Sequence, residues 1–173
     1  MSQTFYLNSS AIGVDLNSGS ATALFAVGTH VLGNNDTEWV YVQANTSIPS
    51  NTIVCYNSGT FTCAMASAGD SILGGQLATA QTSISSQAYG WVAIRGIGLS
   101  IQVLGTTTAG STIYVAGAGG GSGTGQLTNN VSGSTTAAGI TNVGGTVSAT
   151  ATASGFNLAV FNLMWPRWNA QLG

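Results

Sequence analysis

The sequence predicts an all-β fold, and three observations lead to this prediction. Apolar and polar residues alternate with a period of two in most segments that carry large side chains, as in strands with one buried face. Glycine, Asn, Ser and Thr separate these segments at short intervals, which is typical of turns. No segment combines a sustained 3.6-residue period with strong helix formers. The 173 residues suit one domain, so we expect a single small β-barrel or β-sandwich over residues 1–173.

Charge is the most unusual feature of the composition. Charged residues make up 3% of the chain, against about 25% in ordinary soluble domains, and Arg95 and Arg167 are its only Lys or Arg residues. Two arginines cannot neutralise the roughly 6–10 phosphates of a DNA-binding footprint, so we expect no nucleic-acid partner. Polar residues interrupt every apolar run before it reaches the ~20 residues of a membrane span. Weak self-repulsion favours a homo-oligomer.

The N-terminal part predicts an extended arm followed by two strands. The arm, residues 1–22, lacks the basic region and the long apolar core of a secretory signal. The segments "EWVYVQ" (38–43) and "NTIVCY" (51–56) are rich in β-branched and aromatic residues, which favour strands.

The segment "CYNSGTFTC" (55–63) predicts a hairpin whose loop is centred on Gly59 and whose register sets Cys55 opposite Cys63. Two interpretations of the cysteines remain open. They form a disulfide by oxidation after leaving a reducing cytoplasm, or they are two small buried apolar side chains. The following segment "GGQLATAQTSIS" (74–85) contains good helix formers and predicts one or two helical turns.

The C-terminal part predicts two further hairpins. In "YGWVAIRGIGLSIQVLG" (89–105), a loop at residues 96–98 would set Trp91 opposite Val103 and Ala93 opposite Ile101. In the second, from residue 146 to 160, a turn at residues 154–155 would set small side chains opposite large ones. The expected pairs are Ala153 with Phe156, Ala151 with Leu158 and Ala149 with Val160.

Between these hairpins we expect a strand at "STIYVAG" (111–117) and a long flexible loop over residues 117–139, which contain almost no large apolar side chain. The chain closes with a tail, residues 164–173.

The segment from residue 28 to 48 contains His30, Asp36 and Glu38, a set that raises the question of catalysis or metal binding. We interpret it as structural: "GNNDTE" (33–38) has the residues of a tight turn, and we expect a surface or inter-strand structural role for His30. Hydrolytic and glycosidic sites need several titratable groups with opposed roles, and this chain has four acids and one His. A calcium site is less favoured, because the spaced acidic pattern is missing. We therefore expect no enzyme, no catalytic residue, no metal and no cofactor.

Two groups of aromatic residues are candidates for binding. In the tail "MWPRWNAQLG", Trp165, Arg167 and Trp168 are of the types enriched at interface hot spots. The tail either contacts a neighbouring subunit or another protein, or folds back over its own barrel. Elsewhere, Trp39, Tyr41, Tyr89 and Trp91 would suit a sugar-binding platform, although alternating aromatic residues are more often core.

Three segments resemble the capsid decoration (cement) proteins of tailed bacteriophages. They are "GTHVLGNNDTEWVYVQANTSIPSNTIVCYN" (28–57), "GWVAIRGIGLSIQVLGTTTAGSTIYVAG" (90–117) and "AGITNVGGTVSATATASGFNLAVFNL" (138–163). The likeness lies in the order of strands and turn glycines over roughly residues 24–163. In the closing element it is carried by Gly144, Gly145, Val147, Ala149, Gly155, Val160 and Leu163.

This resemblance implies a structural virion protein without catalytic residues. Such proteins assemble in the host cytoplasm and bind the outer face of the capsid, where they stabilise the shell. The implied partner is the major capsid protein, and the implied state is a homotrimer. The long Gly-rich loop and the tail depart from the pattern. The alternative function is a receptor- or glycan-binding module of a tail or adhesin.

Overall fold

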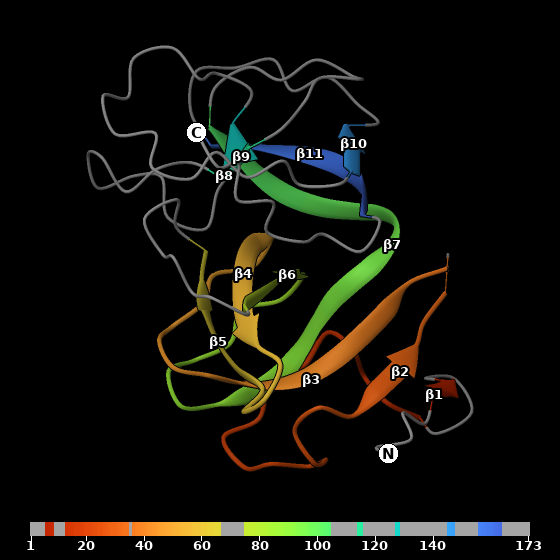
Figure 1. Ribbon diagram of the computed structural model, residues 1–173, viewed down its shortest axis with the longest axis vertical. Helices are drawn as coiled ribbons and strands as arrows, with labels where there is room; N and C mark the ends of the chain where they lie inside the picture. The colour runs from red at the N-terminus through yellow and green to blue at the C-terminus, as the bar shows by residue number, and fades with distance from the viewer. Residues whose placement is uncertain are drawn as a thin grey trace.

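The structure is a computed structural model, and it describes residues 6–8, 13–34, 36–66, 75–104, 114–115, 127–128, 145–147 and 156–163. All regular elements of this part are β-strands, which confirms the predicted fold class (Figure 1). The strands are β1 Tyr6–Asn8, β2 His30–Leu32, β3 Glu38–Ala44, β4 Thr52–Asn57, β5 Thr62–Met65, β6 Gly75–Ala80, β7 Tyr89–Leu104, β8 Tyr114–Val115, β9 Leu127–Thr128, β10 Gly145–Val147 and β11 Phe156–Leu163. Within the described ranges, no helix is long and apolar enough to cross a membrane.

Five of the strands close into a barrel. Their order is β3-β5-β4-β6-β7, and β3 pairs back onto β7. The closing pair runs antiparallel from Glu38 opposite Arg95 to Gln43 opposite Tyr89. Closure leaves these strands without open edges. This matters because the chain has no lysine, the residue that most often prevents an edge strand from pairing with another chain.

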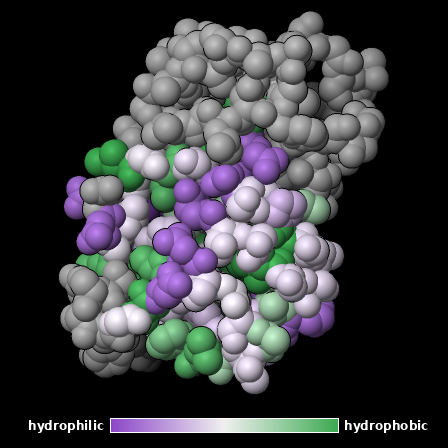
Figure 2. Space-filling view, turned by 180° about the vertical axis from the view of Figure 1, so that it is seen from behind, coloured by the Kyte–Doolittle hydropathy of each residue, from purple (hydrophilic) through white to green (hydrophobic). Residues whose placement is uncertain are grey.

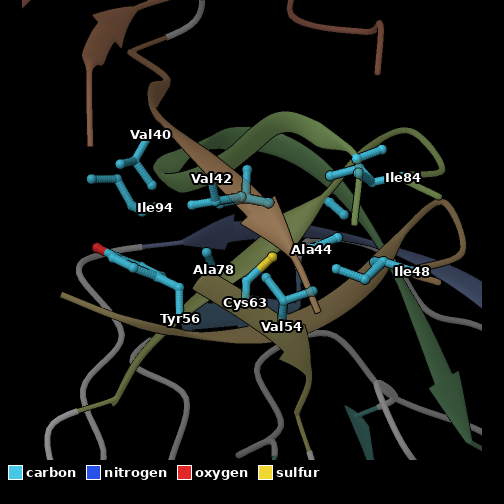
Figure 3. Packing of buried hydrophobic residues seen from close by; sticks show 13 residues of the cluster. Val40, Val42, Ala44, Ile48, Val54, Tyr56, Cys63, Ala78, Ile84 and Ile94 are labelled. Carbon is cyan, nitrogen blue, oxygen red and sulfur yellow. The ribbon is translucent and has the colours of Figure 1, made fainter. Parts of the chain in front are cut away.

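The barrel interior is filled by small and β-branched side chains. Each barrel strand contributes to one buried cluster, and Figure 3 shows these side chains gathered between β3 and β4. The cluster comprises Val40, Val42, Ala44, Ile48, Val54, Tyr56, Cys63, Ala78, Ala80, Ile84, Ala88, Val92 and Ile94. At one end, Ile48 and Ile84 exchange two backbone hydrogen bonds of 2.8 and 2.9 Å, and both side chains are buried.

A second cluster covers the outer face of the same strands. Along β3, Trp39 and Tyr41 belong to this outer cluster, whereas Val40 and Val42 belong to the interior. Because side chains alternate along a strand, β3 is buried on both faces. The outer cluster is covered by residues 13–29, which we call the N-terminal strap, and by the second half of β7.

Strand β7 replaces one of the predicted hairpins. It runs unbroken over 16 residues, pairing with β3 in its first half and with β11 in its second. The reversal predicted at residues 96–98 is therefore wrong. Gly96 and Gly98 have φ values of 150° and 80°, and the register shifts at Ile94 against β3 and at Gly98 against β11, so this segment is a bulged bend.

The bend still brings the predicted side chains to one place. Trp91 and Ala93 share the outer cluster with Ile101 and Val103, although each half of β7 has its own partner strand. Glycines permit either a turn or a bend, and the presence of β3 and β11 as partners decides between them.

Two glutamines fix the second half of β7 to the barrel. The Gln81 side chain donates to the Ser100 carbonyl at 2.9 Å and accepts from the Ser100 amide at 3.0 Å. The Gln81 amide group therefore bonds to the Ser100 backbone in the way that a residue of a neighbouring strand would. Gln102 adds a backbone bond to the Asn51 carbonyl at 2.7 Å and a side-chain bond to the Ser50 carbonyl at 3.0 Å.

The helical turns expected within residues 74–85 are also wrong, because this region contains strand β6. It pairs antiparallel with β4 from Thr52 opposite Ala80 to Asn57 opposite Gly75. Leu77 faces the outer cluster and Ala78 the interior. Burial on both faces outweighs the helix preference of Gln, Leu and Ala.

The hairpin predicted at residues 55–63 forms with a register one residue away from the prediction. In the pairing of β4 with β5, Cys63 lies opposite Tyr56, and Cys55 lies opposite Ala64. In the second predicted hairpin, β10 pairs with β11, and Val147 lies opposite Phe161. The turn residues 154–155 and the small residues Ala149, Ala151 and Ala153 lie outside the described part.

The remaining predicted segments are described only in part. Strand β8 lies within the predicted strand 111–117, and β9 is the described part of the loop 117–139. The tail 164–173 lies outside the described residues.

Gly28 provides a test of how the strap is held. Its φ is +84°, and a Cβ built there would lie 2.4 Å from Cε2 of Phe61. Gly28→Ala should lower the free energy of unfolding by on the order of 2 kcal/mol or more, from backbone strain and overpacking together. Urea unfolding measures the change.

Gly13→Ala is the matched control, because Gly13 has φ +64° and no atom within 4 Å of a built Cβ. Its free energy of unfolding should fall only by the cost of placing an alanine at a positive φ. Equal losses for both variants would show that Phe61 does not restrict Gly28.

Candidate functional site

His30 and Glu38 form the one contact between a basic and an acidic side chain within 4 Å in the described part of the chain. His30 Nδ1 lies 3.2 Å from Glu38 Oε1, with 17% of the His30 side chain and 3% of the Glu38 side chain exposed. The register of β2 and β3 sets His30 opposite Val40 and Leu32 opposite Glu38. The two side chains are therefore diagonal neighbours on one face of the sheet, within reach of each other.

The turn between β2 and β3 positions Glu38. Asp36 has φ +53°, and the Thr37 amide donates to the Asn34 carbonyl at 3.2 Å. The Thr37 hydroxyl also donates to that carbonyl at 2.7 Å and accepts from Trp39 Nε1 at 2.9 Å. The predicted tight turn at residues 33–38 is thus confirmed, and Asp36 is exposed on it and takes no part in the His30–Glu38 contact.

Tyr56 lies near this pair at the same end of the barrel. Burial raises the pKa of Tyr56 to about 12, with smaller contributions from Glu38 and Cys55. Its hydroxyl donates to Gln76 Oε1 at 2.9 Å. On the other side of Glu38, Arg95 is the cross-strand neighbour, and its side chain is exposed.

This arrangement suits a structural role. A buried carboxylate needs a hydrogen-bonding partner, and His30 supplies one from the neighbouring strand. The described residues contain no group of three or more His, Cys, Asp or Glu side chains that could hold a metal ion. The pair therefore joins β2 to the barrel, and of the two structural roles expected for His30, surface or inter-strand, the structure shows the inter-strand one.

The four aromatic residues considered as a sugar platform lie mostly in the core. Trp39, Tyr41 and Trp91 are buried, and Tyr89 is partly buried. The rings of Tyr41 and Trp91 are 4.9 Å apart, and those of Tyr41 and Tyr89 are stacked at 6.1 Å. A sugar cannot reach the faces of buried rings, so in this structure the four residues form no such platform.

Sequence reasoning missed the residue that covers these rings. Phe25 of the strap lies 5.4 Å from the ring centroids of both Tyr41 and Trp91, edge-on to Tyr41. The strap is fastened beside it, because the Leu24 amide donates to the Tyr41 hydroxyl at 3.2 Å. A single large ring within the small residues of "SATALFAVG" is the signal that could have identified Phe25 as an anchor.

Cys55 and Cys63 do not face each other. Cys55 belongs to the outer cluster and Cys63 to the interior, so the two side chains lie on opposite faces of the hairpin. Both are buried and outside any disulfide. Of the two interpretations, the structure supports the buried thiols, and the predicted opposition is wrong by one residue of register.

Trp165, Arg167 and Trp168, the predicted interface residues of the tail, lie outside the described residues. The chain matches no protein-family model and no curated protein sequence.

A double-mutant cycle will measure the His30–Glu38 pair. His30→Ala and Glu38→Gln should each destabilise the barrel, with a coupling free energy of about 1 kcal/mol. Urea unfolding of the two single variants and the double variant gives the value. Additive losses would show that the pair contributes nothing beyond its separate side chains.

Stability should fall at alkaline pH. Burial raises the pKa of Cys63 to about 12 from an ordinary value of 9.0, with a smaller contribution from Cys55. Between about pH 9 and 12 the unfolded chain releases this proton while the folded chain keeps it. The free energy of unfolding therefore decreases with pH, by at most about 1.4 kcal/mol per pH unit for each such proton.

Tyr56 has the same effect between about pH 10 and 12, where the unfolded chain releases the Tyr56 proton and the folded chain keeps it. Cys63→Ala and Tyr56→Phe should each make the alkaline loss less steep, as urea unfolding at pH 8 to 11 will show. The Cys63 explanation fails if the Cys63→Ala variant keeps the full slope.

Proposed function

We propose that this protein is a structural virion protein that binds the outer surface of a bacteriophage capsid and stabilises the shell. Its proposed partner is the major capsid protein, its proposed state is a homotrimer, and it takes its place on the virion exterior after assembly in the host cytoplasm. The proposal assigns it no enzymatic activity and no cofactor.

The observation that carries the proposal is a closed barrel, buried on both faces of its central strand, with very few ionisable groups. Among residues with described side chains, the exposed charges are those of Asp15, Asp36 and Arg95. Glu38 is buried and paired with His30. Such a surface offers mainly hydroxyl, amide and small apolar groups, which suit a permanent interface better than they suit chemistry.

The fold also supports a mechanical role. The closed barrel, the two buried clusters and the glutamine bonds that fix β7 give a compact scaffold without long open edges in its barrel. A protein that reinforces a shell must remain folded while the shell is under load, and interactions that resist local opening serve this purpose. The glycan-binding alternative has no comparable support, because its aromatic platform is buried.

Binding to particles tests the proposal. Purified protein added to capsids that lack it should sediment with them at a saturable stoichiometry and raise the temperature at which they release DNA. Saturable binding to a glycan array, without binding to capsids, would contradict the proposal and favour the alternative.

The same assay tests the tail. Replacing Trp165 and Trp168 with Ala should weaken binding by on the order of 2 to 4 kcal/mol and leave the circular dichroism of the barrel unchanged. Leu32→Ala is the control, since Leu32 is 42% exposed on β2. Unchanged binding by the tail variant, or a loss of β-sheet signal, would rule out the tail as a docking element.

A further inference from the structure

The N-terminal strap carries an apolar surface that faces solvent. Its residues Ala21, Ala23, Leu24, Ala26 and Val27 are all exposed, and we call these five residues the strap patch. The exposed fractions of Leu24 and Val27 are 66% and 38%. Figure 2 shows green and pale green atoms at the lower end of the molecule, where the strap lies in Figure 1.

The strap patch is not a loose segment that happens to be apolar. The Ser20 and Tyr89 backbones exchange two hydrogen bonds of 2.9 and 2.8 Å, and the Gly28 amide donates to the Tyr41 carbonyl at 2.8 Å. Between these anchors, Phe25 points inward onto Tyr41 and Trp91. The same contacts that bury Phe25 hold its neighbours Leu24 and Ala26 on the outside.

The exposed apolar residues of the strap also lie close together in the sequence. Single exposed apolar residues are common on protein surfaces, whereas a contiguous group indicates an interaction site. Besides Leu24 and Val27, the large apolar residues exposed in the described part are Leu32 and Ile97. Ile97 lies at the bend of β7, so it is a surface residue of the same kind in a different part of the chain.

We propose that the strap patch is the contact between copies of this chain. Residues 16–29 contain no ionisable side chain. Two or three copies can therefore bring this segment together around a symmetry axis without placing like charges opposite each other. A charged partner would find no complementary group there, whereas a second strap patch supplies matching small and apolar side chains.

This inference deepens the homo-oligomer of the proposed function and rests on that part of it. It predicts that oligomerisation depends on a surface distinct from the tail.

Polar substitutions in the strap patch test the inference. The variant Leu24→Ser with Val27→Ser changes two exposed side chains, so the barrel should remain folded by circular dichroism. Its dissociation constant for self-association, measured by sedimentation equilibrium at micromolar concentration, should rise at least about tenfold. Ala23→Glu should act in the same direction by placing like charges across the contact.

Ile97→Ser is the matched control, because Ile97 is 54% exposed outside the strap patch, and it should self-associate like the wild type. The inference is overturned if the wild type is a monomer, or if both strap variants keep its oligomeric state. If the wild type is a monomer and floats with phosphatidylcholine vesicles, the result overturns the inference and identifies the strap patch as a lipid-binding surface instead.

Capsid binding separates the two proposals. If the wild type is an oligomer, its strap variants dissociate and the protein does not bind capsids, the strap contact is supported and the virion function is refuted. A protein that binds capsids as a monomer would refute the contact alone.

Discussion

The burial of β3 on both faces and its pairing along both edges is the constraint on which the rest of the structure depends. Its seven residues contribute Trp39 and Tyr41 to one cluster and Val40, Val42 and Ala44 to the other. On one edge it pairs with β7, and on the other with β2 and then β5. Closure of the barrel and attachment of the strap both require this strand to be in place.

The double burial also explains where the few charges go. Glu38 begins β3 at a position that the barrel covers, so its carboxylate needs a partner from a neighbouring strand, and His30 provides it. Asp36 and Arg95 remain at the surface. In a chain with so few ionisable groups, this buried pair serves to attach β2 to β3.

The sequence was a good guide to strands and a poorer guide to their partners. "EWVYVQ" and "NTIVCY" were identified because their β-branched and aromatic residues are typical of strands whatever they pair with. The bend at residues 96–98 was misread, because Gly96 and Gly98 suit a reversal as well as a bulge, and only β3 and β11 select the bulge. Register was lost by one residue at Cys63 for a similar reason, since its partner strand β4 is buried on both faces, so the pattern of β4 does not select one register.

The predictions for individual sites also succeeded where local residue types decide and failed where distant contacts decide. The turn around Asp36 follows from local residue types, and the structure agrees with it. The sequence left a surface and an inter-strand role open for His30, and only the pairing of β2 with β3 decides between them. The covering of Tyr41 and Trp91 by Phe25 depends on a contact between residues far apart in the sequence, which local patterns do not report. The roles of Trp165, Arg167 and Trp168 remain predictions.

The pairing of β3 with β7 has a consequence for synthesis on the ribosome. Residues 38–44 emerge early, yet the strand that completes their sheet is not made until residues 89–95 follow. Until then a nascent chain presents a strongly apolar strand with no lysine nearby to discourage intermolecular pairing. The strap is translated just before β3. Its early docking onto Tyr41 would cover one face of β3 until β7 has been synthesised.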